Sequence, residues 1–134
     1  MNIENFSDLL RVARAQPLPQ RLLFVFVDAV LADDANALQR EGFEAGHGGS
    51  LVPIMCVEKT PDDLSSFDAL VHEAAQFGYP WRLVFSAAMS GRSQSAPGGK
   101  EVDGALKTMV EAIKRGQLAG YLALDRQGLA VVLE

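Results

Sequence analysis

The most continuous apolar segment of the chain runs from Leu22 to Val27, six residues with no polar residue among them. A strand with one face in water would alternate apolar and polar residues. The unbroken run is rich in Val and Phe and too short to cross a membrane. It therefore predicts a central strand that other elements cover on both faces.

Apolar segments alternate with helical patterns along the rest of the chain. We expect further strands at 51–57, 82–89, 120–125 and 129–133, and helices at 5–15, 36–45 and 102–115. In the helix at 36–45, Leu38 and Phe43 are expected to face inward. Pro53 lacks an amide hydrogen, so the strand at 51–57 is expected near a sheet edge or to pair only after Pro53.

A further helix start is expected at Thr60. Its hydroxyl can accept an amide hydrogen bond, Pro61 suits the first helical position, and two aspartates follow. Apolar residues then recur at helical spacing as far as Ala74, and Gly78 and Pro80 end the pattern. The pattern predicts one helix from Thr60 to the end of this stripe.

The elements follow the order α-β-α-β-α-β-α-β-β. Strands that alternate with helices favour crossover connections between parallel strands. We therefore predict an α/β fold in which helices pack on a mainly parallel (mixed) sheet, with a C-terminal β-hairpin turning at 125–128. The length of 134 residues predicts a single domain, 1–134, built as a three-layer sandwich or as a two-layer alternative.

Composition narrows the expected partners. The chain has 17 acidic and 12 basic side chains, a formal net charge of −5, so we expect it to bind neither nucleic acid nor a membrane surface. Its single cysteine, Cys56, lies in an apolar strand pattern and is expected to be buried and inert. The two histidines lack metal-ligand spacing, and we expect no metal and no cofactor. The N-terminus resembles no signal peptide, so we expect a cytoplasmic protein.

Polar residues at the expected strand ends are the candidates for a site. In an open parallel sheet ligands bind beyond the carboxyl ends of the strands, which would gather Asp28, Glu58 and Lys59. The Gly/Ser-rich loop at 90–100 follows a strand and precedes a helix, as phosphate-binding loops do. Its candidate anion-binding residues are Ser90, Arg92, Ser93 and Lys100. The spacing of a Walker A motif is not met, because Gln94 and Glu101 stand where glycine and Ser/Thr are needed.

Three stretches carry a family resemblance: Gln20 to Phe26, Leu51 to Pro61 and Met109 to Lys114. Together they resemble a family of small proteobacterial proteins that are often called "ribonucleotide reductase subunit alpha". The resemblance covers the whole chain and implies no functional residues. That catalyst resembles a barrel of several hundred residues with a radical cysteine and a redox cysteine pair. A chain of 134 residues with Cys56 alone cannot be that catalyst.

Two functions remain open from the sequence. The first is a non-enzymatic binding or regulatory domain, which could form a homodimer by pairing the apolar run 129–133 across a two-fold axis. The alternative is an enzyme that binds a small anionic ligand, a nucleotide or a phosphate compound, through the loop at 90–100. We expect the binding domain rather than the enzyme, because no catalytic set of residues is recognisable. The sequence specifies neither the ligand or partner, nor the strand order, nor the pathway.

Overall fold

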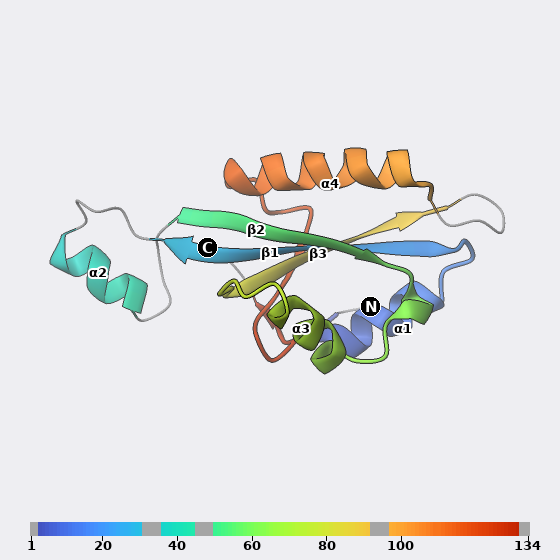
Figure 1. Cartoon of the computed structure of the whole chain (residues 1–134), viewed down its shortest axis with the longest axis horizontal. Helices are drawn as coiled ribbons and strands as arrows, with labels where there is room; N and C mark the ends of the chain where they lie inside the picture. The colour runs from blue at the N-terminus through green and yellow to red at the C-terminus, as the bar shows by residue number, and fades with distance from the viewer. Residues whose placement is uncertain (1–2, 31–35, 45–49, 92–96, 132–134) are drawn as a thin grey trace.

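The computed structural model describes residues 3–30, 36–44, 50–91 and 97–131 (Figure 1). The elements are α1 (Phe6–Arg14), β1 (Gln20–Val30), α2 (Ala37–Glu44), β2 (Ser50–Lys59), the short 3₁₀ helix η1 (Pro61–Asp63), α3 (Phe67–Ala75), β3 (Leu83–Ser90), α4 (Gly99–Lys114), β4 (Leu122–Leu124) and β5 (Ala130–Val131). Their order along the chain follows the predicted alternation of helices and strands.

The strands form one five-stranded sheet in the order β2-β1-β3-β4-β5. Every neighbouring pair in it is antiparallel, so the predicted mainly parallel sheet is wrong. The fold is α/β in content, with helices on an antiparallel sheet. The C-terminal hairpin is confirmed, because β5 pairs antiparallel with β4.

The connections explain the wrong strand direction. Parallel neighbours need a connection that runs back along the sheet, usually as a packed helix. The connection after β1 contains α2, which lies beyond the end of the sheet in Figure 1, and its Leu38 is 77% exposed rather than inward. The chain therefore returns beside β1 in the opposite direction. The side chain of Phe43 lies outside the described residues. The connection through α3 does run back along the sheet, but it places β3 on the other side of β1.

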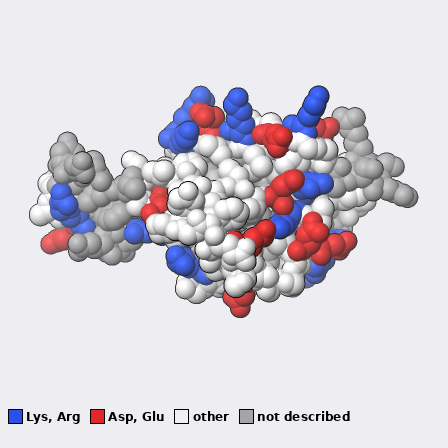
Figure 2. All heavy atoms as spheres, viewed as in Figure 1, with Lys and Arg blue, Asp and Glu red and all other residues white. Residues whose placement is uncertain are grey.

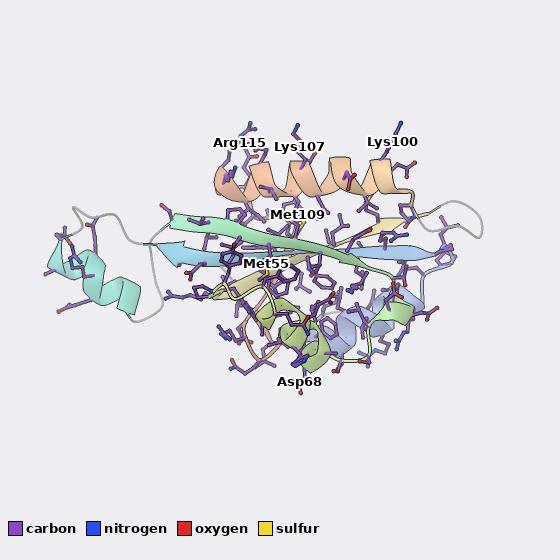
Figure 3. All side chains as sticks on the ribbon, in the orientation of Figure 1. Met55, Asp68, Lys100, Lys107, Met109 and Arg115 are labelled. Carbon is purple, nitrogen blue, oxygen red and sulfur yellow. The ribbon has the colours of Figure 1, made fainter. Side chains whose placement is uncertain are left out.

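The prediction for the central strand is confirmed. Leu22, Phe24 and Phe26 are fully or almost fully buried on one face of β1, in a cluster with the apolar residues of α1 and α3. Leu23, Val25 and Val27 are buried on the other face against α4. Figure 3 shows the two layers through Met55 below the sheet and Met109 above it. The molecule is the three-layer sandwich, with α1 and α3 on one face and α4 on the other.

Helix α3 begins later than its sequence predicts. Thr60 and Pro61 start only the short helix η1, and the backbone becomes extended at Leu64. A second cap, Ser66, whose side chain accepts a hydrogen bond from the Ala69 amide, starts α3. The predicted single helix is therefore wrong, although Leu64 and Phe67 are buried as expected.

Candidate functional site: the free edge of strand β2

The antiparallel sheet separates the predicted cluster of strand-end residues. Lys59 lies opposite Leu22 and Glu58 opposite Leu23, whereas Asp28 lies opposite Val52. Leu22 and Asp28 are six positions apart on β1, which corresponds to about 20 Å along a strand. The carboxyl end of one antiparallel strand lies beside the amino end of the next, so Asp28 does not meet Glu58 and Lys59.

Glu58 and Lys59 have partners within the chain. Glu58 Oε2 lies 3.1 Å from Arg21 Nη1, which joins the ends of β1 and β2. Lys59 Nζ lies 2.9 Å from Glu73 Oε1, which joins β2 to α3. Both pairs are partly exposed, and we assign them the small stabilising effect of surface ion pairs.

The candidate anion-binding residues are only partly described. Ser90 ends β3, where its Oγ accepts a hydrogen bond of 2.9 Å from Gln20 Nε2. Lys100 lies in the first turn of α4 and points away from the sheet (Figure 3). Arg92 and Ser93 lie outside the described residues. The described part of the loop therefore shows no convergence of Ser90 and Lys100 on one point.

The two outer strands of the sheet differ in how their edges are treated. At β5 the N-terminal residues 4–6 cover the outer edge. The amide of Ala130 donates to the Glu4 carbonyl at 2.8 Å, and the amide of Phe6 donates to the Gly128 carbonyl at 2.9 Å. Asn5 forms an isolated antiparallel bridge with Leu129. The edge of β5 at these residues is thus already paired.

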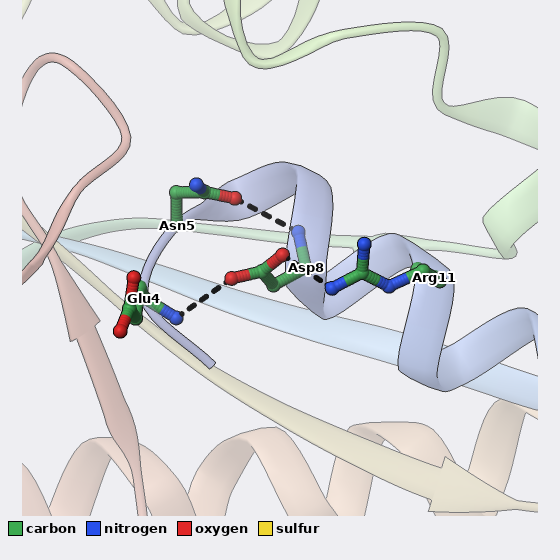
Figure 4. Close-up of polar contacts among 4 residues, drawn as sticks. All are labelled: Glu4, Asn5, Asp8 and Arg11. Atoms are coloured by element: carbon green, nitrogen blue, oxygen red, sulfur yellow. Dashed lines mark hydrogen bonds and ion pairs between the residues drawn. The ribbon is translucent and has the colours of Figure 1, made fainter. Parts of the chain in front are cut away.

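Asp8 holds this cover in place (Figure 4). Its Oδ2 accepts a hydrogen bond of 3.0 Å from the Glu4 amide, and its Oδ1 lies 2.6 Å from Arg11 Nη2. Asn5 caps α1 by accepting a hydrogen bond of 2.9 Å from the Asp8 amide. The start of α1 and the cover of β5 are therefore one hydrogen-bonded unit.

Strand β2, at the opposite side of the sheet, has no such cover among the described residues. The carbonyls of Pro19 and Val27 bond towards the β3 side. Backbone direction alternates along a strand, so Leu22, Phe24 and Phe26 bond towards β2. Their partners on β2 are Lys59, Val57 and Met55.

The β2 residues between those partners, Cys56 and Glu58, consequently direct their N–H and C=O groups away from the sheet. Pro53 lies opposite Val27, so its nitrogen also faces outward and its missing hydrogen costs no bond to β1. A bulge between the pairs of Phe26 and Val27 separates Pro53 from the regular half of the strand. We call the segment Met55–Lys59, with the outward N–H and C=O groups of Cys56 and Glu58, the free edge.

Strand β2 is uncharged and partly apolar as far as Val57, and the two charged residues that follow, Glu58 and Lys59, form ion pairs within the chain. The eight residues from Ser50 to Val57 include no charged residue. Partly buried apolar side chains of the strand itself lie in both layers: Leu51 on the α4 side, and Ile54 and Val57 on the α3 side. In Figure 2 the charged side chains gather along α4 and at one end of the molecule, while the centre of the view, over β2 and α3, is largely white.

Cys56 lies on this edge and is exposed, so the predicted buried thiol is wrong. The prediction treated the apolar segment as interior, but β2 is an outer strand with water on one side. The thiol is still partly screened from water by its neighbours, and this partial burial raises the pKa of Cys56 above its ordinary value. The thiol is therefore protonated at neutral pH, and no described residue activates it as a nucleophile.

The sequence held two signals for this edge. Pro53 correctly predicted an edge position for β2, and the absence of charge from Ser50 to Val57 is visible without a structure. What the sequence could not supply is the pairing of residues 4–6 with β5, which leaves β2 as the uncovered side. That pairing joins the two ends of the chain.

No protein-family model matches the chain, and neither does a curated protein or a solved structure. The protein is therefore classified by its architecture alone, as an α/β protein with an antiparallel five-stranded sheet between two helical layers. The resemblance to the proteobacterial family stays a prediction. None of the helices in the described segments is long and apolar enough to cross a membrane.

Proposed function

We propose that the protein is a binding domain that adds a strand of another polypeptide to the free edge of β2. The observation that carries the proposal is the contrast between the two edges: residues 4–6 pair with β5, while β2 directs outward N–H and C=O groups that no described residue pairs. Proteins usually protect such edges with charges, because an unpaired edge is a template for another strand. The uncharged stretch from Ser50 to Val57 does the opposite.

The mode of binding follows from the geometry of the edge. An added strand would bond through the backbone to Cys56 and Glu58, which gives affinity with little dependence on sequence. Specificity would come from the partly buried apolar side chains of β2 itself, Val57 on the α3 side and Leu51 on the α4 side. The bound segment is therefore expected to be extended and uncharged.

A library of displayed peptides tests this proposal. Selected binders should shift the amide resonances of β2 and of its neighbour β1, and they should be extended and poor in charged residues. Cys56→Pro removes one outward N–H and leaves the bonds to β1 in place, so it should abolish binding. Cys56→Ala retains that N–H and should bind as the natural chain does. Binders that shift only other parts of the molecule would contradict the proposal.

The small-ligand enzyme stays as the second proposal, with Lys100 and Ser90 as its described residues. In its favour the loop leads through Gly98 into the first turn of α4, and the N-terminus of a helix attracts anions. Glu101 in the same turn opposes it. Titration with nucleotides and phosphorylated metabolites, read by thermal shift, checks it, because a bound ligand raises the unfolding temperature.

A further inference from the structure

The partner of the free edge can be specified further, on the basis of the function proposed above. We infer that the free edge of β2 binds β2 of a second copy of this chain, antiparallel about a two-fold axis. A partner strand at this position must be extended, and β2 is extended, with no charged residue from Ser50 to Val57. It is also already ordered, whereas a flexible peptide would lose conformational entropy on binding.

The distribution of charge favours the approach of two copies at this face. Each copy has a formal net charge of −5, so two copies repel one another over most of their surface. The centre of the view in Figure 2 is largely white, and β2 has no charged residue from Ser50 to Val57. The two charges that end the strand are neutralised within each copy, Glu58 by Arg21 and Lys59 by Glu73. Two-fold pairing therefore brings these two charges of β2 into the interface as ion pairs already formed within each copy.

The backbone groups of the edge allow two registers. Outward residues must face outward residues, and Glu58 opposite Glu58 would place two carboxylates together, so Cys56 of one copy lies opposite either Cys56 or Glu58 of the other. Both registers are centred beyond Pro53, whose nitrogen has no hydrogen to donate. In either register the two Cys56 positions lie about 5–8 Å apart, directly or diagonally opposite. A single cysteine per chain makes this distance measurable.

The closed edge at β5 sets the size of the assembly. A sheet with two uncovered edges would add copies without limit. Here the Glu4 carbonyl and the Phe6 amide already pair with β5. Pairing through β2 alone uses the same surface of both copies and stops at a dimer, as isologous interfaces do.

Analytical ultracentrifugation of the full chain in reducing buffer tests the inference. We expect a concentration-dependent dimer, which Cys56→Lys should weaken about tenfold or more, because it places two like charges at the axis. The matched control is Leu129→Lys, an apolar-to-lysine change at a residue that is 52% exposed and lies directly before β5, opposite Asn5, and it should leave the dimer intact. A short bis-maleimide should join the natural chains through Cys56.

The outcomes separate this inference from the proposed function. A dimer that Cys56→Lys weakens, with efficient cross-linking at Cys56, supports the inference. A chain that stays monomeric at every concentration overturns it, and the proposed function still stands if selected peptides bind the edge of that monomer. A dimer that Leu129→Lys disrupts and Cys56→Lys does not also overturns it, and places the interface at the C-terminal run instead.

Discussion

Gly128 is held in a conformation and a space that only glycine fits. Its φ is +81°, and a Cβ at this position would lie 2.9 Å from a ring carbon of Phe67. Gly116 has a similar φ of +75°, but a Cβ at this position would meet no atom within 4 Å. Substitution of Gly116 therefore tests backbone strain alone, whereas substitution of Gly128 adds a steric clash. We expect Gly116→Ala to lower the free energy of unfolding by about 1 kcal/mol and Gly128→Ala by about 2–3 kcal/mol. Urea unfolding measures both, and equal losses would show that the ring of Phe67 moves away without cost.

Asp63 links stability to pH. The hydroxyl and the backbone amide of Thr60 both donate hydrogen bonds to the Asp63 carboxylate, and these bonds lower the pKa of that carboxyl group. The hydrogen bond from the Thr60 amide measures 3.2 Å. The folded pKa is below the unfolded one, so the stabilisation is complete above the unfolded pKa and is lost as the pH falls through the folded pKa. NMR titration should show Asp63 ionising below the ordinary aspartate value, and Asp63→Asn should remove this part of the acid dependence of unfolding. An ordinary titration of Asp63 would contradict the prediction.

At the scale of elements, the cover of β5 depends on one carboxylate. Asp8→Ala removes the acceptor of the Glu4 amide, so residues 4–6 should pair less firmly and the Ala130 amide should exchange hydrogen faster. Arg11→Ala removes only the ion pair with Asp8, in which the Arg11 side chain is 66% exposed, and should leave that amide protected. Hydrogen exchange read residue by residue distinguishes the two variants. Unchanged exchange of Ala130 in Asp8→Ala would show that Asp8 does not hold the cover.

The elements that the sequence predicted correctly are those with local causes. The run around Phe24 is apolar on both faces, and the stripe of α4 through Met109 recurs at helical spacing. The hairpin turn at Gly128 also follows from nearby residues. The helix expected from Thr60 failed at a local detail, because Ser66 offers a competing cap.

The direction of the strands could not be predicted in the same way, because it is set between distant segments. Alternation of helix and strand predicts parallel neighbours only where each helix packs back along the sheet. Leu38 shows that α2 does not do so, since its side chain is exposed despite the helical pattern. The predicted cluster of Asp28 with Glu58 required β1 and β2 to be parallel. Because the two strands are antiparallel, these residues lie at opposite ends of the pair. The exposure of Cys56 follows from the edge position of β2, which Pro53 indicated, whereas the prediction of a buried thiol rested only on the apolar residues around Cys56.

At the scale of the whole molecule, the charge distribution predicts how the proposed dimer responds to salt. An interface held by ion pairs weakens as salt screens them. The interface proposed here contains the uncharged stretch of β2, while the net charge of −5 on each copy opposes association. Added salt screens that repulsion and should therefore strengthen the dimer. Sedimentation at low and high sodium chloride measures the association constant. Lys107 lies on the face of α4 that points away from the sheet (Figure 3), and Lys107→Glu changes the net charge of each copy from −5 to −7. This variant should weaken the dimer at low salt, because the two copies then repel one another more strongly. A dimer that salt weakens would be held by charged contacts, and the free edge of β2 could not then be its main interface.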